Sequence, residues 1–163
     1  MAAGIASDVE ADDSIVELTR ARLPWLILGL IGGLGSVFIL EGFEQVMQHP
    51  SYKTLFFFTP LIAAMAGNVG VQSSAIIVQG LANNTIIGPI IERLLKELSL
   101  SLLNGVILSV ILLAGSYFLL GYEIHVGYTV SIALLSVIIM ASLIGTFIPI
   151  ILNKYGVDPA LAT

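Results

Sequence analysis

Four long stretches of this sequence carry no charged side chain, and they constrain the fold more than any other feature. They are Leu23–Leu40, Thr54–Ile91, Leu98–Tyr122 and Ile124–Asn153, with 18, 38, 25 and 30 residues. A helix that crosses a bilayer needs about 20 mainly apolar residues. The sequence therefore predicts an all-α, polytopic membrane helix bundle with four transmembrane helices, at about residues 24–47, 55–81, 96–121 and 127–152.

Composition excludes several classes of protein. Charged residues make up 10% of the chain, whereas a soluble domain carries roughly 25%. There are 6 Lys and Arg residues and no cysteine, so neither a nucleic-acid-binding patch nor a thiolate metal site is expected. No acid/base pair or nucleophile constellation lies at membrane depth, and His125 stands alone at a boundary, so the chain is not expected to be an enzyme.

The first 22 residues differ from the rest. Five of the eleven acids lie in the first 17 residues, and Ser14 and Glu17 have the spacing of a helix-capping box. Residues 1–22 are therefore expected to be an acidic tail or a short amphipathic helix, ahead of a membrane domain at 23–163. Pro24 is expected in the first turn of the first span, where a helix tolerates proline.

Lysine and arginine predict the orientation. An N-terminus in the cytoplasm places five cations inside and only Lys53 outside, as the positive-inside rule requires. Both ends are then cytoplasmic. The five inner cations are Arg20, Arg22, Arg93, Lys96 and Lys154.

The second predicted span carries amides along one helical face. At about 100° per residue these positions drift by only about 60°, and an amide facing lipid would be unfavourable. One interpretation is that the amides join helices, with Gly67 and Gly70 allowing close approach. The other is an aqueous path, with a locally unwound helix exposing carbonyl oxygens. The amides are Asn68, Gln72, Gln79 and Asn83.

Acidic residues flank the predicted spans at both ends. Glu41 and Glu44 lie three residues apart at the outer end of the first span, and form either solvated headgroup-level charge or an acidic mouth that concentrates cations. At the inner side, pairing at the helix end is expected, which leaves no carboxylate at mid-depth. The residues expected to pair are Glu92, Arg93, Lys96 and Glu97.

Several of these motifs together resemble the transmembrane domain of the MgtE magnesium transporter and channel family. They appear in family order over roughly residues 20–163. The motifs are Arg22-Leu-Pro-Trp25, Glu41-Gly-Phe-Glu44, Gly67-Asn-Val-Gly-Val-Gln-Ser73, Lys96-Glu97 and Gly156-Val-Asp-Pro-Ala160.

The resemblance implies a homodimer in the inner (plasma) membrane, with a divalent-cation pore between protomers. Magnesium would be the transported substrate, and no organic cofactor is expected. Asn68, Gln72, Gly67 and Gly70 match the family's second-helix motif, Glu44 matches its acidic residue at the end of the first helix, and Glu41 stands beside it.

The sequence also departs from the family pattern. Ala66 replaces a glycine, and Val71 replaces an amide that some members carry. The regulatory N-terminal and CBS domains and the fifth membrane helix, with its pore carboxylate, are not present in the sequence. The leading hypothesis is divalent-cation transport through second-helix amides and backbone carbonyls. The alternatives are a non-conducting scaffold or accessory subunit, and a truncated, inactive transport domain.

Overall fold

The computed structural model describes residues 14–48, 50–86 and 88–159, and these are helical with no strand among them. Four of the helices are long and apolar enough to cross a membrane, so the predicted all-α membrane bundle is confirmed. In chain order the elements are α1 (Ile15–Glu41), α2 (Glu44–Met47), the 3₁₀ helix η1 (Pro50–Phe58), α3 (Thr59–Ala82), α4 (Ile90–Ala114), the π-helical turn η2 (Gly115–Leu119) and α5 (Ile124–Lys154).

Helix α1 begins at Ile15, nine residues before the predicted start of the first span at about residue 24. The capping box is confirmed: the Glu17 amide donates to Ser14 Oγ at 3.4 Å, and the Ser14 amide donates to Glu17 Oε2 at 3.1 Å. The helix therefore starts at Ile15, and residues 1–13 of the predicted acidic tail lie outside the described residues.

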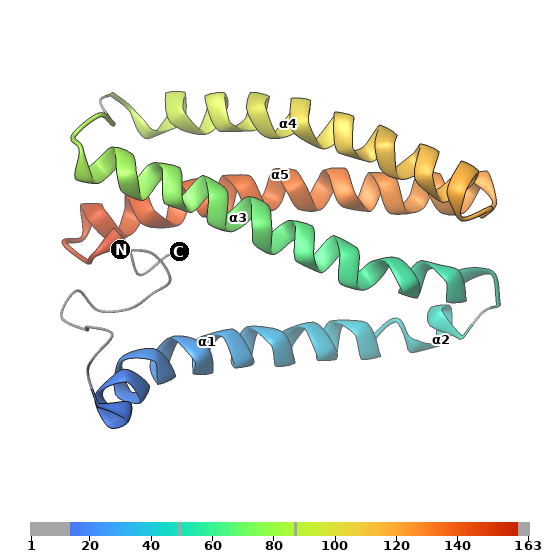
Figure 1. The fold of residues 1–163 in the computed structure, drawn as a ribbon, viewed down its shortest axis with the longest axis horizontal. Helices are drawn as coiled ribbons and strands as arrows, with labels where there is room; N and C mark the ends of the chain where they lie inside the picture. The colour runs from blue at the N-terminus through green and yellow to red at the C-terminus, as the bar shows by residue number, and fades with distance from the viewer. Residues whose placement is uncertain (1–13, 49, 87, 160–163) are drawn as a thin grey trace.

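The predicted place of Pro24 in a first turn is wrong, because this proline lies inside α1. An internal proline removes one backbone hydrogen bond and clashes with the carbonyl four residues earlier. Figure 1 shows that the first turns of α1 are set at an angle to the rest of the helix.

The other predicted spans are correct in number but wrong at their ends. Thr59 opens α3 because Pro60 suits a first turn. Helix α4 starts at Ile90, six residues before the predicted boundary at 96, and α5 runs past both ends of 127–152. Helices α4 and α5 extend beyond the apolar segments to charged residues, including Arg93 and Lys154, whereas α3 begins four residues later than position 55.

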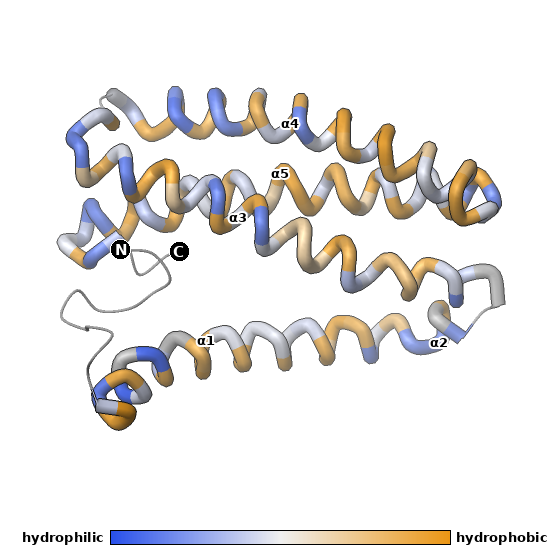
Figure 2. The backbone as a smooth tube through the Cα atoms, viewed as in Figure 1, coloured by the Kyte–Doolittle hydropathy of each residue, from blue (hydrophilic) through white to orange (hydrophobic). Residues whose placement is uncertain are grey.

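Helices α3, α4 and α5 pack together, while α1 stands apart from them (Figure 1). Helix α5 contacts both α3 and α4. None of the apolar span of α1 is buried. Figure 2 shows hydrophobic residues along all four long helices, with hydrophilic residues in the middle of α3 as well as at the ends.

Two glycines allow α3 and α5 to cross closely. A Cβ atom added to Gly145 would lie 2.5 Å from the carbonyl oxygen of Gly70, so only glycine fits there. Pro149, which is fully buried, follows one turn later inside α5. The predicted close approach at Gly70 is therefore seen, but Gly67 has open space around it.

The four long helices alternate in direction. The start of α1, the end of α3, the start of α4 and the end of α5 lie at one end of the molecule (Figure 1). This arrangement brings Arg20, Arg93, Lys96 and Lys154 to that end and leaves Lys53 at the other, as the positive-inside count assumes.

Candidate cation site

A glutamate lies buried where α3, α4 and α5 meet. The Glu97 side chain on α4 is 6% exposed, and its Oε1 accepts hydrogen bonds from Ser73 Oγ on α3 at 2.7 Å and from Ser142 Oγ on α5 at 2.5 Å. The two hydroxyl oxygens are 3.2 Å apart. One carboxylate oxygen therefore links all three helices of the bundle.

This contact overturns one sequence-based expectation. Glu97 does not form a helix-end pair; its partners are hydroxyls on two other helices. Glu97 lies about 10 Å along α4 from the helix start at Ile90, at 1.5 Å per residue, and so nearer this end of the helix than its middle.

A buried carboxylate needs compensation, since transfer of a charge into a low-dielectric region costs several kcal/mol. Two hydroxyl donors supply part of it, because hydrogen bonds to an ionised acceptor are the stronger kind. Among the described residues, no lysine, arginine or histidine forms an ion pair with Glu97. No cationic side chain of the described residues therefore neutralises the Glu97 carboxylate, which leaves it available to a cation.

Glu97 lines a cavity of about 380 Å³ that is also lined by two of the four predicted amides. Asn68 and Gln72 reach it from α3, and Asn104 reaches it from α4, two turns beyond Glu97. Carboxylate and amide oxygens are the donors that hard divalent cations prefer. These oxygen donors occupy part of a wall that is otherwise mainly apolar, with side chains such as Met65, Leu100 and Ile138.

Asn68 and Gln72 are exposed in the single chain, and neither side chain has a hydrogen bond to another helix within the described residues. Both interpretations of the amides therefore stay predictions. The hydroxyls of Ser73, Ser142 and Ser109 make contacts between helices.

The expected local unwinding of the second span is also wrong. Helix α3 continues without a break from Thr59 to Ala82, so its carbonyl oxygens around Asn68 lie within an intact α-helix. The oxygens available to the cavity are therefore those of side chains.

The other predicted site residues lie elsewhere. Glu41 ends α1 and Glu44 begins α2, so they do not share one helix. Both are exposed at the far end of α1, and Glu44 Oε1 accepts from Gln48 Nε2 at 3.0 Å. Gln79 and Asn83 do not line the cavity around Glu97.

Sequence reasoning missed Glu97, Ser73, Ser142 and Asn104. A signal was present: Glu97, Ser101, Gly105 and Ser109 recur every four residues, and these four are the buried residues of α4. Small and polar residues at that spacing mark the packed face of a membrane helix. His125 was also misjudged as isolated, because its Nδ1 lies 3.2 Å from Glu123 Oε2, at an exposed position.

Comparison with known proteins gives a consistent family. The family model for MgtE, described as a divalent cation transporter, matches residues 59–163. A magnesium transporter MgtE of Bacillus subtilis is 35% identical over 162 residues, which is 99% of this chain and 35% of the relative. A magnesium transporter MgtE of Thermus thermophilus is 34% identical over 149 residues, covering 91% of this chain and 32% of the relative.

A third relative, the magnesium transporter MgtE of Enterococcus faecalis, is 31% identical over 157 residues, covering 94% of this chain and 34% of the relative. The chain thus spans about a third of the length of these curated relatives. The family model covers well over half of the chain, including the helices that form the cavity. The chain belongs to the MgtE family of divalent cation transporters.

Proposed function

We propose that this chain forms part of a path for magnesium ions across a membrane, lined by the polar cavity of α3, α4 and α5. The observation that carries the proposal is the buried Glu97 carboxylate in one cavity with Asn68, Gln72 and Asn104. The magnesium transporters among the relatives support the choice of ion.

Magnesium holds its water shell tightly and favours octahedral coordination by oxygen. In the proposed path the amide oxygens of Asn68 and Gln72 accept hydrogen bonds from water molecules in that shell. The ion therefore keeps part of its water shell as it passes. Glu97 supplies negative charge that offsets the transfer of the ion into a region of low dielectric constant.

The proposal includes a homodimer. Helix α1 is apolar, and none of its span is buried within the chain, so its faces are open to lipid and to a second copy. Light scattering of the protein in detergent tests this part, and the mass of a single chain would contradict it.

The proposed location is the inner (plasma) membrane, with the N-terminus in the cytoplasm. The clustering of cations at one end of the bundle supports this orientation. Single cysteines introduced at positions 20 and 53 test it by labelling from one side of sealed vesicles. Labelling of position 20 from outside would contradict the proposed orientation.

Magnesium uptake into liposomes tests the path. The variant Asn68→Leu removes an oxygen donor from the cavity. Its matched control is Gln79→Leu, which removes an amide of the same helix outside the cavity. We expect uptake to fall about tenfold with Asn68→Leu, as the loss of about 1.4 kcal/mol of hydrogen bonding predicts, and to change little with Gln79→Leu.

Uptake by Asn68→Leu equal to the wild type would contradict the assigned path. A folded wild-type chain that conducts nothing would instead favour the scaffold or accessory subunit. Glu44 and Glu41 remain proposed as an outer, acidic approach to the path, at the end of the molecule away from the clustered cations.

A further inference from the structure

A second, larger cavity lies at the cation-rich end of the bundle. It has a volume of about 610 Å³ and lies between the end of α3, residues 85, 86, 88 and 89, the start of α4 and the end of α5. Its polar lining includes three of the six cations in the chain and one carboxylate. The residues are Arg93, Lys96, Lys154, Glu92, Asn153 and Thr85.

The described residues supply no partner for the cations of this cavity: no hydrogen bond or ion pair is formed there by the side chains of Arg93, Lys96 or Lys154. The two lysines are exposed, whereas the Nε of Arg93 is buried with no acceptor in that part of the chain. A buried guanidinium N–H without an acceptor costs about 1–3 kcal/mol or more, so this group calls for an acceptor, and an anion beside it would also be attracted by the positive charge.

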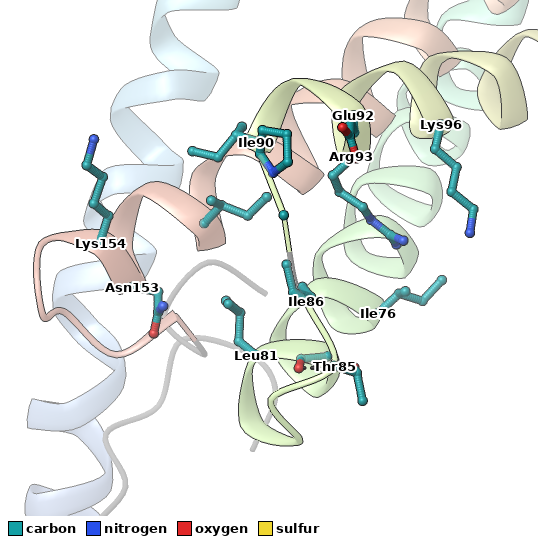
Figure 3. A pocket seen from close by; sticks show the side chains of 14 residues that line it. Ile76, Leu81, Thr85, Ile86, Ile90, Glu92, Arg93, Lys96, Asn153 and Lys154 are labelled. Atoms are coloured by element: carbon teal, nitrogen blue, oxygen red, sulfur yellow. Dashed lines mark hydrogen bonds between the residues drawn. The ribbon is translucent and has the colours of Figure 1, made fainter.

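The polar lining comes from two helices. In Figure 3 Arg93 and Lys96 extend from α4 toward the side of α3, while Asn153 and Lys154 stand on α5 and the amino group of Lys154 points away from Arg93. Gly88, Pro89 and Ile90 bring the start of α4 to the same cavity, and no side chain caps this helix. A helix start adds a partial positive charge, which the Glu92 carboxylate in the first turn partly offsets.

We propose that this cavity binds a phosphate group, at a site that adjoins the cavity around Glu97, since Ile76 lines both. Three cations outnumber Glu92, and arginine matches phosphate oxygens with two parallel donors. The rest of the wall is apolar, with Ile76, Leu81, Ile86, Ile90 and Ile150. Such a mixed lining at a membrane boundary fits the headgroup and glycerol of an anionic phospholipid, and inorganic phosphate shares the same recognition chemistry.

Binding of short-chain phosphatidylglycerol to the full chain in detergent tests the proposal, measured by native mass spectrometry and thermal unfolding. Inorganic phosphate and short-chain phosphatidylcholine form the comparison arms. We expect phosphatidylglycerol to bind and to raise the unfolding temperature. Arg93→Gln should weaken its binding about fivefold, as expected for one juxtamembrane cation.

The matched control is Lys53→Gln, which removes a cation at the opposite end of the bundle and should leave binding unchanged. Lys96→Gln, at an exposed position, gives a second variant should Arg93→Gln fail to fold, and the same fivefold loss is expected. Phosphate binding with the same dependence on Arg93 would support the site and assign it to free phosphate. No binding in any arm, equal binding of phosphatidylcholine, or equal loss with Lys53→Gln would overturn the proposal.

Discussion

Helix α1 and the bundle of α3, α4 and α5 have similar apolar composition but pack in opposite ways. In α1 apolar side chains point outward on all sides, and Phe38 is 72% exposed. Gly29, Gly32, Gly33 and Gly35 have no atom near the place a Cβ would take. In the bundle the buried residues include Glu97 and the serines that contact it.

The difference shows what holds these helices together. Lipid tails are as apolar as leucine, so apolar residues give little preference for another helix over the bilayer. Glycine crossings and hydroxyl contacts distinguish the bundle, and α1 has neither with α3, α4 or α5 among the described residues. Apolar length therefore identifies a span, whereas small and polar residues identify its packed face.

The largest expected effect comes from closing the glycine crossing. Gly145→Ala places a Cβ 2.5 Å from the Gly70 carbonyl oxygen, and the forced separation of α3 and α5 should cost about 3 kcal/mol of unfolding free energy. Gly32→Ala in α1 is the matched control, since it meets open space and should stabilise the helix by about 1 kcal/mol. Denaturant titration in detergent measures the unfolding free energy of both variants. Equal effects would contradict the difference in packing between α1 and the bundle.

A smaller effect is expected from removal of the buried carboxylate. Glu97→Ala leaves the hydroxyls of Ser73 and Ser142 without their shared acceptor and should cost about 2 kcal/mol of stability. Glu41→Ala, at an exposed position where α1 ends, should change the unfolding temperature little. A stable Glu97→Ala variant would mean that the contact does not hold the three helices together.

The smallest effect is expected from single hydroxyls. Ser109 Oγ on α4 donates to the carbonyl oxygen of Ser131 on α5 at 2.9 Å, and Ser109→Ala should cost about 0.6 kcal/mol, a typical value between membrane helices. Ser36 Oγ bonds within α1 to the carbonyl of Gly32, so Ser36→Ala should be neutral. Thermal unfolding of the two variants side by side tests this difference. A larger drop in unfolding temperature for Ser36→Ala than for Ser109→Ala would contradict it.

The number of spans could be predicted from the sequence, because a long charge-free run reflects contact with lipid and does not depend on which other helices it packs against. The amide face of α3 was also predictable, since 3.6-residue periodicity places Asn68 and Gln72 one turn apart. The role of Glu97 was not, because its neighbours in sequence are charged while its partners are 24 and 45 residues away. The charged residues before Glu97 also explain why the predicted start of this span, at 96, lies after the observed start of α4 at Ile90.

Pro149 has a consequence for the mechanics of α5. Proline has no amide hydrogen, so the carbonyl of Gly145 loses its donor within the helix. The backbone of α5 is thus weakest in the turn that follows its contact with Gly70. The last residues of the helix, up to Lys154, are therefore joined to the rest through a turn that has one backbone hydrogen bond fewer.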